Sequence, residues 1–210
     1  MKRALVLLLF AVAATAAEPV KVGVFSAGDL DGWESKTFRG ATTYALTESE
    51  GRRVLRADSR AAASGMYKRV HIDLEQTPYL RWSWRVTRTF GQLDETQKRG
   101  DDYPARVYVV FSGGVFFWNT RALNYVWASA QPQGAIWPNA YTGNAQMLAV
   151  RSGNARVGEW VEERRNVRAD FQRLFGRDVR YVDAVALMTD TDDTGESAIA
   201  YYGDIYFSAD

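Results

Sequence analysis

The segment GDDYPARVYVVFSGGVFFWNTRALNYVWAS, residues 100–129, decides the fold of this chain. Residues 106–111 form a run of mostly apolar side chains that is typical of a buried strand, and residues 124–127 predict a second strand after a turn. Asp101 and Asp102 come directly before the first of these strands. Polar groups therefore lie at the ends of two core strands, which is the arrangement that a binding site on a β-scaffold needs.

The remaining chain is also mostly short strands and turns. The clearest alternation follows Pro78, where Leu80, Trp82, Trp84 and Val86 share one side and polar residues occupy the other. A period of two with one apolar face is typical of a sheet that buries a single side. The pattern predicts two such sheets packed face to face.

One short helix is expected at residues 167–175. Asn166 can cap its first turn, Phe171 and Phe175 share a face at i and i+4, and Gly176 suits the position after its last turn. No internal repeat or low-complexity linker is visible. The predicted fold is all-β, a two-sheet antiparallel β-sandwich with this one helix.

The N-terminus has the pattern of an export signal. Lys2 and Arg3 precede an apolar run over residues 4–14, and small residues follow it. This run is shorter than the roughly 20 apolar residues that a membrane-spanning helix needs. We therefore expect a signal peptide over residues 1–17 and a periplasmic or secreted protein with no transmembrane segment in the mature chain.

The composition of the chain narrows the function classes. Residues 18–210 suit one β-sandwich domain of ordinary size. Cysteine is absent, which argues against thiol catalysis and thiolate metal sites. The 26 Lys and Arg residues nearly balance the 25 Asp and Glu residues, so the charge does not favour a nucleic-acid partner. Oligomeric state is not predicted.

Two further sets of residues resemble known proteins. The loop at residues 29–33, DLDGW, and the closing strand at 202–207, YGDIYF, resemble galactose-binding-like jelly rolls, in which the first and last strands pair. Many proteins of that fold are carbohydrate-binding modules. A second set resembles a bacterial secreted family, domain of unknown function 3047. Its motifs are GDD at 100–102, ARVYVVF at 105–111, LNYVW at 123–127, DF at 170–171 with LFG at 174–176, and DTD at 190–192 with TG at 194–195. This resemblance implies export and one domain but no activity.

A polar cluster on the opening segment is the first candidate site. A charged and amide floor with aromatic walls would suit a sugar or another small polar ligand. The alternative is structural, with Arg106 in a buried ion pair that fixes a loop to the sheet. The candidate ligand-binding residues are Asp101, Asp102, Arg106, Asn124, Tyr125 and Trp127.

The acidic loop at residues 190–196, DTDDTGE, is the second candidate. Alternating oxygen ligands followed by glycine are typical of the start of a calcium loop, and Asp190, Asp192 and Asp193 are the expected ligands. The alternative is a solvated hairpin, since Asp, Thr and Gly are ordinary turn residues. Calcium is favoured over zinc because His71 is the one histidine of the chain.

Tryptophans in predicted loops could stack on sugar rings. These are Trp33, Trp118, Trp127 and Trp137. The run Phe116, Phe117 and Trp118 is either a core strand or an exposed patch for a protein partner.

The preferred hypothesis is a non-catalytic β-sandwich that binds a carbohydrate or similar polar ligand. One alternative is a polysaccharide lyase built from Tyr125, Arg106 and His71, or a glycoside hydrolase using a pair of carboxylates. The other is an interaction module of the cell envelope. No nucleophile motif GxSxG occurs, which disfavours serine hydrolases.

Overall fold

The computed structural model describes residues 17–113 and 120–210. Nearly all of the predicted signal peptide and the whole run 116–118 lie outside these residues. The described part contains thirteen strands, one α-helix and two 3-10 helices: β1 (Val20–Gly23), η1 (Phe25–Ala27), β2 (Trp33–Arg39), β3 (Thr43–Ser49), β4 (Arg52–Arg60), β5 (Ala63–Asp73), β6 (Tyr79–Val86), η2 (Lys98–Gly100), β7 (Ala105–Phe111), β8 (Arg121–Ala128), β9 (Ile136–Pro138), β10 (Ala145–Ser152), β11 (Val161–Asn166), α1 (Val167–Phe175), β12 (Tyr181–Asp190) and β13 (Ser197–Ser208).

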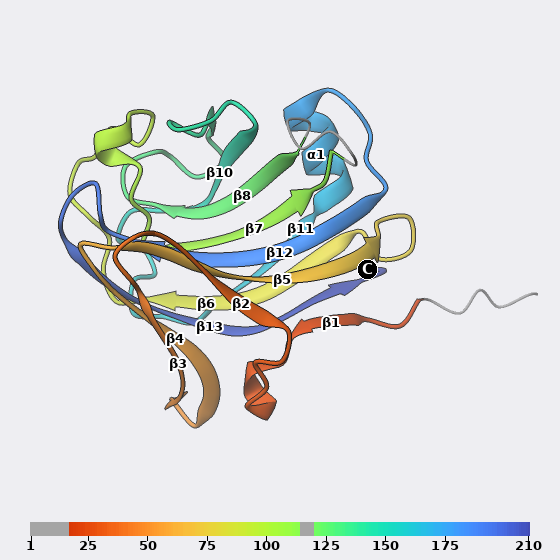
Figure 1. The fold of residues 1–210 in the computed structure, drawn as a ribbon, viewed down its shortest axis with the longest axis horizontal. Helices are drawn as coiled ribbons and strands as arrows, with labels where there is room; N and C mark the ends of the chain where they lie inside the picture. The colour runs from red at the N-terminus through yellow and green to blue at the C-terminus, as the bar shows by residue number, and fades with distance from the viewer. Residues whose placement is uncertain (1–16, 114–119) are drawn as a thin grey trace, which may run out of the picture.

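The strands form two sheets that lie face to face (Figure 1). The six-stranded sheet has the order β11-β6-β13-β4-β3, and β1 also pairs with β13. The seven-stranded sheet has the order β2-β5-β12-β7-β8-β10-β9. The predicted β-sandwich and the pairing of its first and last strands are confirmed. The expectation of purely antiparallel sheets is wrong at one place, because β8 and β10 are parallel and are joined through the β9 excursion.

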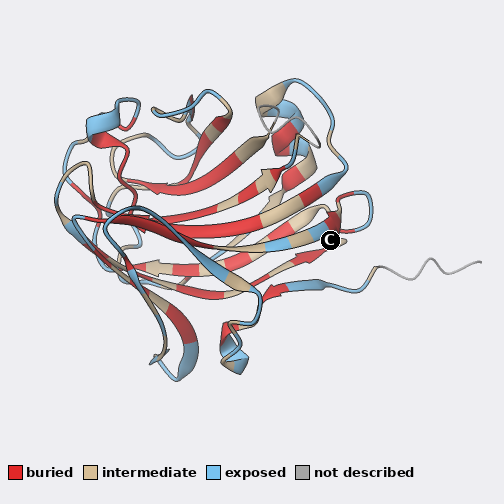
Figure 2. Ribbon diagram, in the orientation of Figure 1, coloured by how far each residue is buried: buried red, intermediate tan, exposed pale blue. Residues whose placement is uncertain are grey.

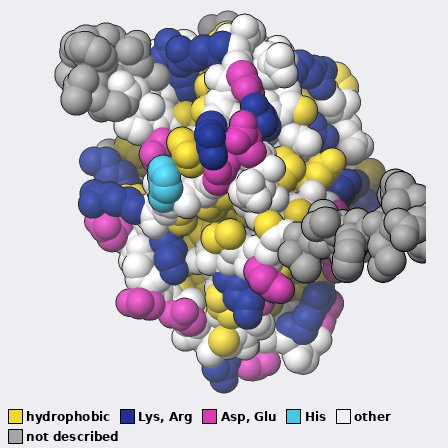
Figure 3. All heavy atoms as spheres, turned by 90° about the vertical axis from the view of Figure 1, so that its right-hand side faces the viewer, with side chains coloured by type: hydrophobic (Ala, Val, Ile, Leu, Met, Phe, Trp, Pro, Cys, Tyr) yellow, Lys and Arg dark blue, Asp and Glu magenta, His cyan; other side chains and the backbone are white. Residues whose placement is uncertain are grey.

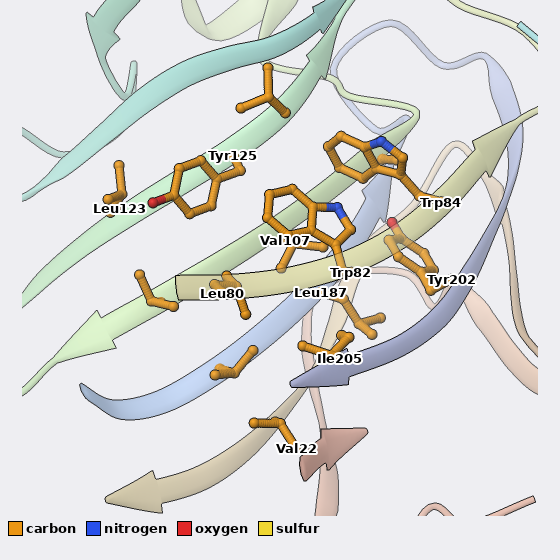
Figure 4. Packing of buried hydrophobic residues seen from close by; sticks show 14 of the residues in the cluster. Val22, Leu80, Trp82, Trp84, Val107, Leu123, Tyr125, Leu187, Tyr202 and Ile205 are labelled. Carbon is orange, nitrogen blue, oxygen red and sulfur yellow. The ribbon is translucent and has the colours of Figure 1, made fainter. Parts of the chain in front are cut away.

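The core lies between the two sheets, as the red strands in Figure 2 show. The alternation on β6 has the predicted effect, since Trp82 and Trp84 are buried. Trp82 packs on Tyr125 with ring centroids 5.4 Å apart (Figure 4), and Trp84 packs on Trp127 at 6.0 Å. Each pair joins β6 of one sheet to β8 of the other. Such contacts add about 0.5–1.5 kcal/mol beyond area burial.

Helix α1 has the predicted bounds and caps. The side chain of Asn166 accepts a hydrogen bond from the backbone amide of Ala169, and Gly176 adopts the left-handed conformation after the last turn. Phe171 is buried and stacks on Phe111, with ring centroids 4.3 Å apart. The helix therefore covers one end of the sandwich. None of the helices in the described residues is long and apolar enough to span a membrane.

A second, smaller core covers part of the outer face of the seven-stranded sheet. It consists of Tyr103, Val126, Ala128, Trp137, Met147 and Ala149. The fully buried carboxylate of Glu95 fixes this cover, because it accepts hydrogen bonds from the backbone amides of Ser129, Ala130 and Gln131. The cover leaves the neighbouring part of the sheet open.

The end of the sandwich on the right of Figure 1 carries mixed charges. Figure 3 shows Lys and Arg side chains interspersed with Asp and Glu side chains over this end. Arg168 of α1 pairs with Asp178, and Arg180, directly before β12, pairs with Asp73 at the end of β5. These exposed pairs are screened by solvent and contribute little to stability.

Candidate ligand-binding cleft

A cleft of about 480 Å³ opens on the outer face of the seven-stranded sheet. Strand alternation determines its floor. On β7, Val107 and Val109 point into the core, so Arg106 and Tyr108 point outward into the cleft. Further lining residues come from neighbouring strands and loops: Phe38, Arg39, Ala63, Asp101, Ala122, Asn124, Asn139, Tyr141, Thr142, Ala145, Met188, Asp190, Asp192 and Asp193.

A buried ion pair forms the centre of the floor. A terminal nitrogen of Arg106 lies 2.6 Å from a carboxylate oxygen of Asp190, and the two side chains are 9% and 4% exposed. The other oxygen of Asp190 accepts a hydrogen bond from the backbone amide of Tyr103, whose ring lies 4.7 Å from the guanidinium. The pair therefore joins strand β7 to the start of the acidic loop.

The pKa values in this pair follow from burial and neighbouring charge. Burial opposes the charge on Arg106, but Asp190 and Asp101 outweigh burial and raise the pKa of Arg106. Burial raises the pKa of Asp190, and Asp101 and Asp102 add to the rise, while Arg106 acts in the opposite direction. In the described residues the Nε atom of Arg106 is buried without a hydrogen-bond partner.

Asp101 lines one wall of the cleft. The side-chain amide of Asn139 donates hydrogen bonds to both of its oxygens, at 3.1 and 2.9 Å, and the hydroxyl of Tyr103 donates a third. Burial raises the pKa of Asp101, although Arg106 and these donors lower it in part. The wall thus holds a carboxylate that protonates more readily than an exposed aspartate.

The acidic loop forms the adjacent wall and is tied to Asp102. The carboxylate of Asp102 accepts hydrogen bonds from the backbone amides of Asp193 and Thr194, at 3.2 and 2.7 Å. One oxygen from each of Asp102, Asp192 and Asp193 lies within 4.8 Å of the others. Burial raises the pKa of Asp192, and its two acidic neighbours raise it further.

The grouping of the acids corrects the expected metal ligands. Asp192 and Asp193 come together as predicted, but Asp190 is held by Arg106 and Asp102 takes its place. Three carboxylates supply the hard oxygens that calcium prefers, so Asp102, Asp192 and Asp193 would hold such an ion. Calcium binding itself stays a prediction.

Two exposed aromatic side chains flank the polar floor. Phe38 is 62% exposed and Tyr141 is 54% exposed, and both line the cleft. Phe38 lies where the pairing of β2 with β5 shifts between Thr37 and Arg39, and such an irregularity redirects a side chain. The hydroxyl of Tyr141 donates to the carboxylate of Asp193 at 2.7 Å, which connects two loops across the cleft.

The structure separates Tyr125 and Trp127 from Asp101, Arg106 and Asn124, which line the cleft; Asp102 is also fully buried and does not line it. Tyr125 and Trp127 are both fully buried between the sheets, whereas Asn124 lines the cleft. Successive residues on a strand point to opposite faces, so Asn124 cannot share a face with its neighbour Tyr125. The hydroxyl of Tyr125 donates to Asp170 of α1 (3.0 Å), and the indole of Trp127 donates to the carbonyl of Gly153. Their predicted place in the site is wrong.

Three other residues that the sequence suggested for function also lie outside the cleft. Trp137 is 5% exposed in the smaller core, and Trp33 is partly buried against Phe25, so neither offers a free face in the cleft. His71 lies on β5 and stacks on Tyr181 at 4.5 Å. It is not among the residues that line the cleft, and Tyr125 is in the core. The proposed lyase set is therefore not assembled.

Sequence reasoning missed Phe38, Tyr141 and Asn139. Phe38 was visible only as one apolar residue in a strand-like segment, and the other two lie in the connection over residues 131–144. The sequence feature that could have indicated Tyr141 is an aromatic residue within a segment of turn residues, NAYTGN at 139–144. Their approach to Asp101 and Asp193 depends on contacts between loops that are distant in sequence.

The chain belongs to the family described as protein of unknown function, DUF3047, whose model matches residues 31–206. The predicted family resemblance is confirmed. The comparison with curated proteins found no match.

Solved structures with a similar fold include several β-sandwich domains. The xyloglucanase domain of NopAA from Sinorhizobium fredii, in complex with cellobiose, is 9% identical with a TM-score of 0.47, over 86% of this chain and 95% of that one. The active domain of tailspike protein 4 of bacteriophage CBA120 is 11% identical with a TM-score of 0.44, over 90% of this chain. The Endo-D glycoside hydrolase domain of Streptococcus pneumoniae is 14% identical with a TM-score of 0.38, over 85% of this chain.

This chain spans 21% of the length of each of the last two structures. At these identities and TM-scores, the resemblance does not extend to activity. The function is therefore inferred from the residues of the cleft.

Proposed function

We propose that the cleft binds an uncharged carbohydrate or a similar polyhydroxylated ligand. The observation that supports this most is the pair of exposed aromatic side chains, Phe38 and Tyr141, on either side of a polar floor. Flat aromatic rings pack on the apolar C–H faces of sugars, and a few fixed polar groups orient the ligand. Both rings offer exposed apolar surface at the cleft, which a sugar ring could cover.

The polar groups of the cleft favour hydroxyls over charged ligand groups. The carboxylates of Asp101, Asp192 and Asp193 can accept hydrogen bonds from hydroxyls, and the side-chain amide of Asn124 supplies both a donor and an acceptor. Asp190 already neutralises the buried Arg106, so the acids of the cleft outnumber its free cations. An anionic sugar would meet net repulsion here.

The leader sequence bears on where binding would occur. A signal peptide over residues 1–17 would direct the protein to the periplasm or the medium, where polysaccharides are accessible. Fractionation of the expressing cells, with N-terminal sequencing of the exported protein, tests this proposal. An intact N-terminus in the cytoplasm would contradict it.

Calorimetric titration of the protein with neutral oligosaccharides tests the binding proposal. We expect Phe38→Ala to weaken binding at least about tenfold, equivalent to 1.4 kcal/mol, because the ring would contact the sugar. Tyr181→Ala is the matched control, since Tyr181 is a partly exposed aromatic residue that does not line the cleft. Equal affinities for the two variants, or no binding of any neutral sugar, would refute the proposal.

One observation favours a glycoside hydrolase as the second candidate. Burial raises the pKa of Asp101, which lines the cleft near Asp192 and Asp193, and a carboxyl group with a raised pKa can act as a general acid beside a second carboxyl group. An enzyme would release reducing ends from a bound oligosaccharide, and Asp101→Asn would stop this release while retaining binding. Binding without turnover across the same sugars would leave the non-catalytic function.

A further inference from the structure

A second hollow, of about 510 Å³, lies on the six-stranded sheet and is separated from the cleft by the core. Its floor includes a β-bulge, because Gly203 and Asp204 of β13 together lie opposite Ser83 of β6. A Cβ atom at position 203 would lie 2.2 Å from the Ser83 hydroxyl oxygen. Only glycine permits this close approach, so the local sequence builds the hollow.

The hollow is lined by four arginines, Arg52, Arg53, Arg81 and Arg164. Arg53 lies 3.5 Å from Glu48, and Arg81 is held by the C-terminal residue Asp210. In the described part of the chain, no carboxylate lies within ion-pair distance of Arg52 or Arg164. These two guanidinium groups contact aromatic rings, Arg52 that of Trp160 at 4.6 Å and Arg164 that of Tyr79 at 3.7 Å, but neither has an anionic partner among the described residues.

The acids of the hollow cancel this charge only in part. Glu163 is held by Arg151 at 2.6 Å and by the indole of Trp84, and Asp204 accepts hydrogen bonds from the backbone and hydroxyl of Ser26. Glu162 remains on the rim. The four arginines that line the hollow outnumber its three acids, in contrast to the cleft on the opposite sheet, where acids outnumber arginines.

A buried indole donor in the wall also lacks a partner. The Nε1 atom of Trp160 is buried and makes no hydrogen bond within the described residues, and Trp160 lines the hollow. Buried Trp N–H groups normally have an acceptor, and an acceptor on a bound ligand would satisfy this one. The guanidinium of Arg52 lies 4.6 Å from the ring of Trp160, which places a cation beside this donor.

We propose that this hollow is a second ligand site, which binds an acidic saccharide. The carboxylate or sulfate group would bind Arg52 and Arg164, and the sugar ring would lie along Trp160 and Tyr206. Glu162 and Ser83 would accept hydrogen bonds from its hydroxyls, as they could not from a simple inorganic anion. The volume falls in the range of small-molecule sites, roughly 300–1,000 Å³.

Titration with trigalacturonate, with a heparin-derived sulfated disaccharide and with a neutral xylo-oligosaccharide tests the proposal. Arg52→Ala with Arg164→Ala should weaken binding of the acidic sugar about tenfold or more, because two charge-assisted contacts are lost. Both side chains are exposed, so the double variant should fold, as a thermal melt can verify. The relative affinities for trigalacturonate and the disaccharide distinguish a carboxylate from a sulfate ligand.

Arg69→Ala is the matched control. Arg69 is also an exposed arginine over an aromatic ring, 6.0 Å from Tyr67, but it does not line the hollow. Trp160→Phe keeps an aromatic ring and removes the indole donor, so it should weaken binding by a smaller factor. Equal binding of the acidic sugar by the double variant and by Arg69→Ala would overturn the proposal, as would no binding of either acidic sugar by the parent. Binding of acidic sugar that survives Phe38→Ala would separate this site from the cleft.

Discussion

Removing Arg106 should test whether the floor of the cleft depends on its ion pair. Arg106→Met removes the cation but keeps much of the side-chain volume, and it leaves Asp190 buried with only the Tyr103 amide as a donor. The two charges are 2.6 Å apart and at most 9% exposed. Breaking a buried pair on one side costs about 3–5 kcal/mol, and the lost contact with the Tyr103 ring adds roughly 0.5–1 kcal/mol. This is a large share of a typical stability of about 5–15 kcal/mol.

The same pair allows a double-mutant cycle. Asp190→Asn retains an acceptor for the Tyr103 amide, and it should cost less than Arg106→Met because Asp101 also stabilises the Arg106 charge. The double variant, Arg106→Met with Asp190→Asn, buries no net charge, so its loss should fall short of the sum by about 2 kcal/mol or more. Urea unfolding at neutral pH, followed by tryptophan fluorescence, measures the free energy of unfolding of the parent, the two single variants and the double variant. A coupling below about 0.5 kcal/mol would refute the view that this pair fixes the loop to β7.

Three other perturbations have defined outcomes. Folding raises the pKa of Asp101, so the contribution of this carboxyl group to the free energy of unfolding is full below the unfolded pKa and declines as the pH rises. Asp101→Asn should therefore gain stability relative to the parent from about pH 4 upward. A stability difference between variant and parent that does not change with pH would contradict this. Tyr125→Phe should cost about 1–3 kcal/mol in urea unfolding, because a buried hydroxyl bonded to Asp170 is lost, yet leave sugar affinity unchanged; weaker binding would return Tyr125 to the site. Millimolar calcium should raise the melting temperature of the parent but not of Asp192→Asn, and an unchanged parent would remove the calcium prediction.

Period-two alternation explains which site residues could be predicted. Arg106 and Asn124 lie on the outer faces of β7 and β8, where the polar side chains of a half-buried strand are expected. The grouping of Asn124 with Tyr125 and Trp127 ignored that alternation, and the aromatic pair is in the core. Alternation also fails ahead of Pro104, since Asp102 caps the acidic loop and does not pair with Arg106.

Contacts between loops could not be predicted from the sequence. Tyr141 meets Asp193 across 52 positions, and Glu95 fixes the loop that follows β8 from 34 to 36 positions away. These pairings depend on where the smaller core places the connection over residues 131–144, and no local periodicity encodes that position. The strands were therefore predictable from local pattern, whereas the walls of the cleft were not.

The chain is nearly neutral as a whole, but its two concave surfaces differ in the charge of the residues that line them. The cleft on the seven-stranded sheet is lined by Asp101, Asp190, Asp192 and Asp193 against two arginines, one of which is neutralised by Asp190. The hollow on the six-stranded sheet is lined by four arginines, and two of its three acids already accept hydrogen bonds. A net charge of +1 averages over these faces and so predicts neither of them. Because the core separates the two sheets, the neutral and acidic sugars proposed for these surfaces would not compete for one site. A neutral sugar that displaced the acidic one would show that the two surfaces form a single site.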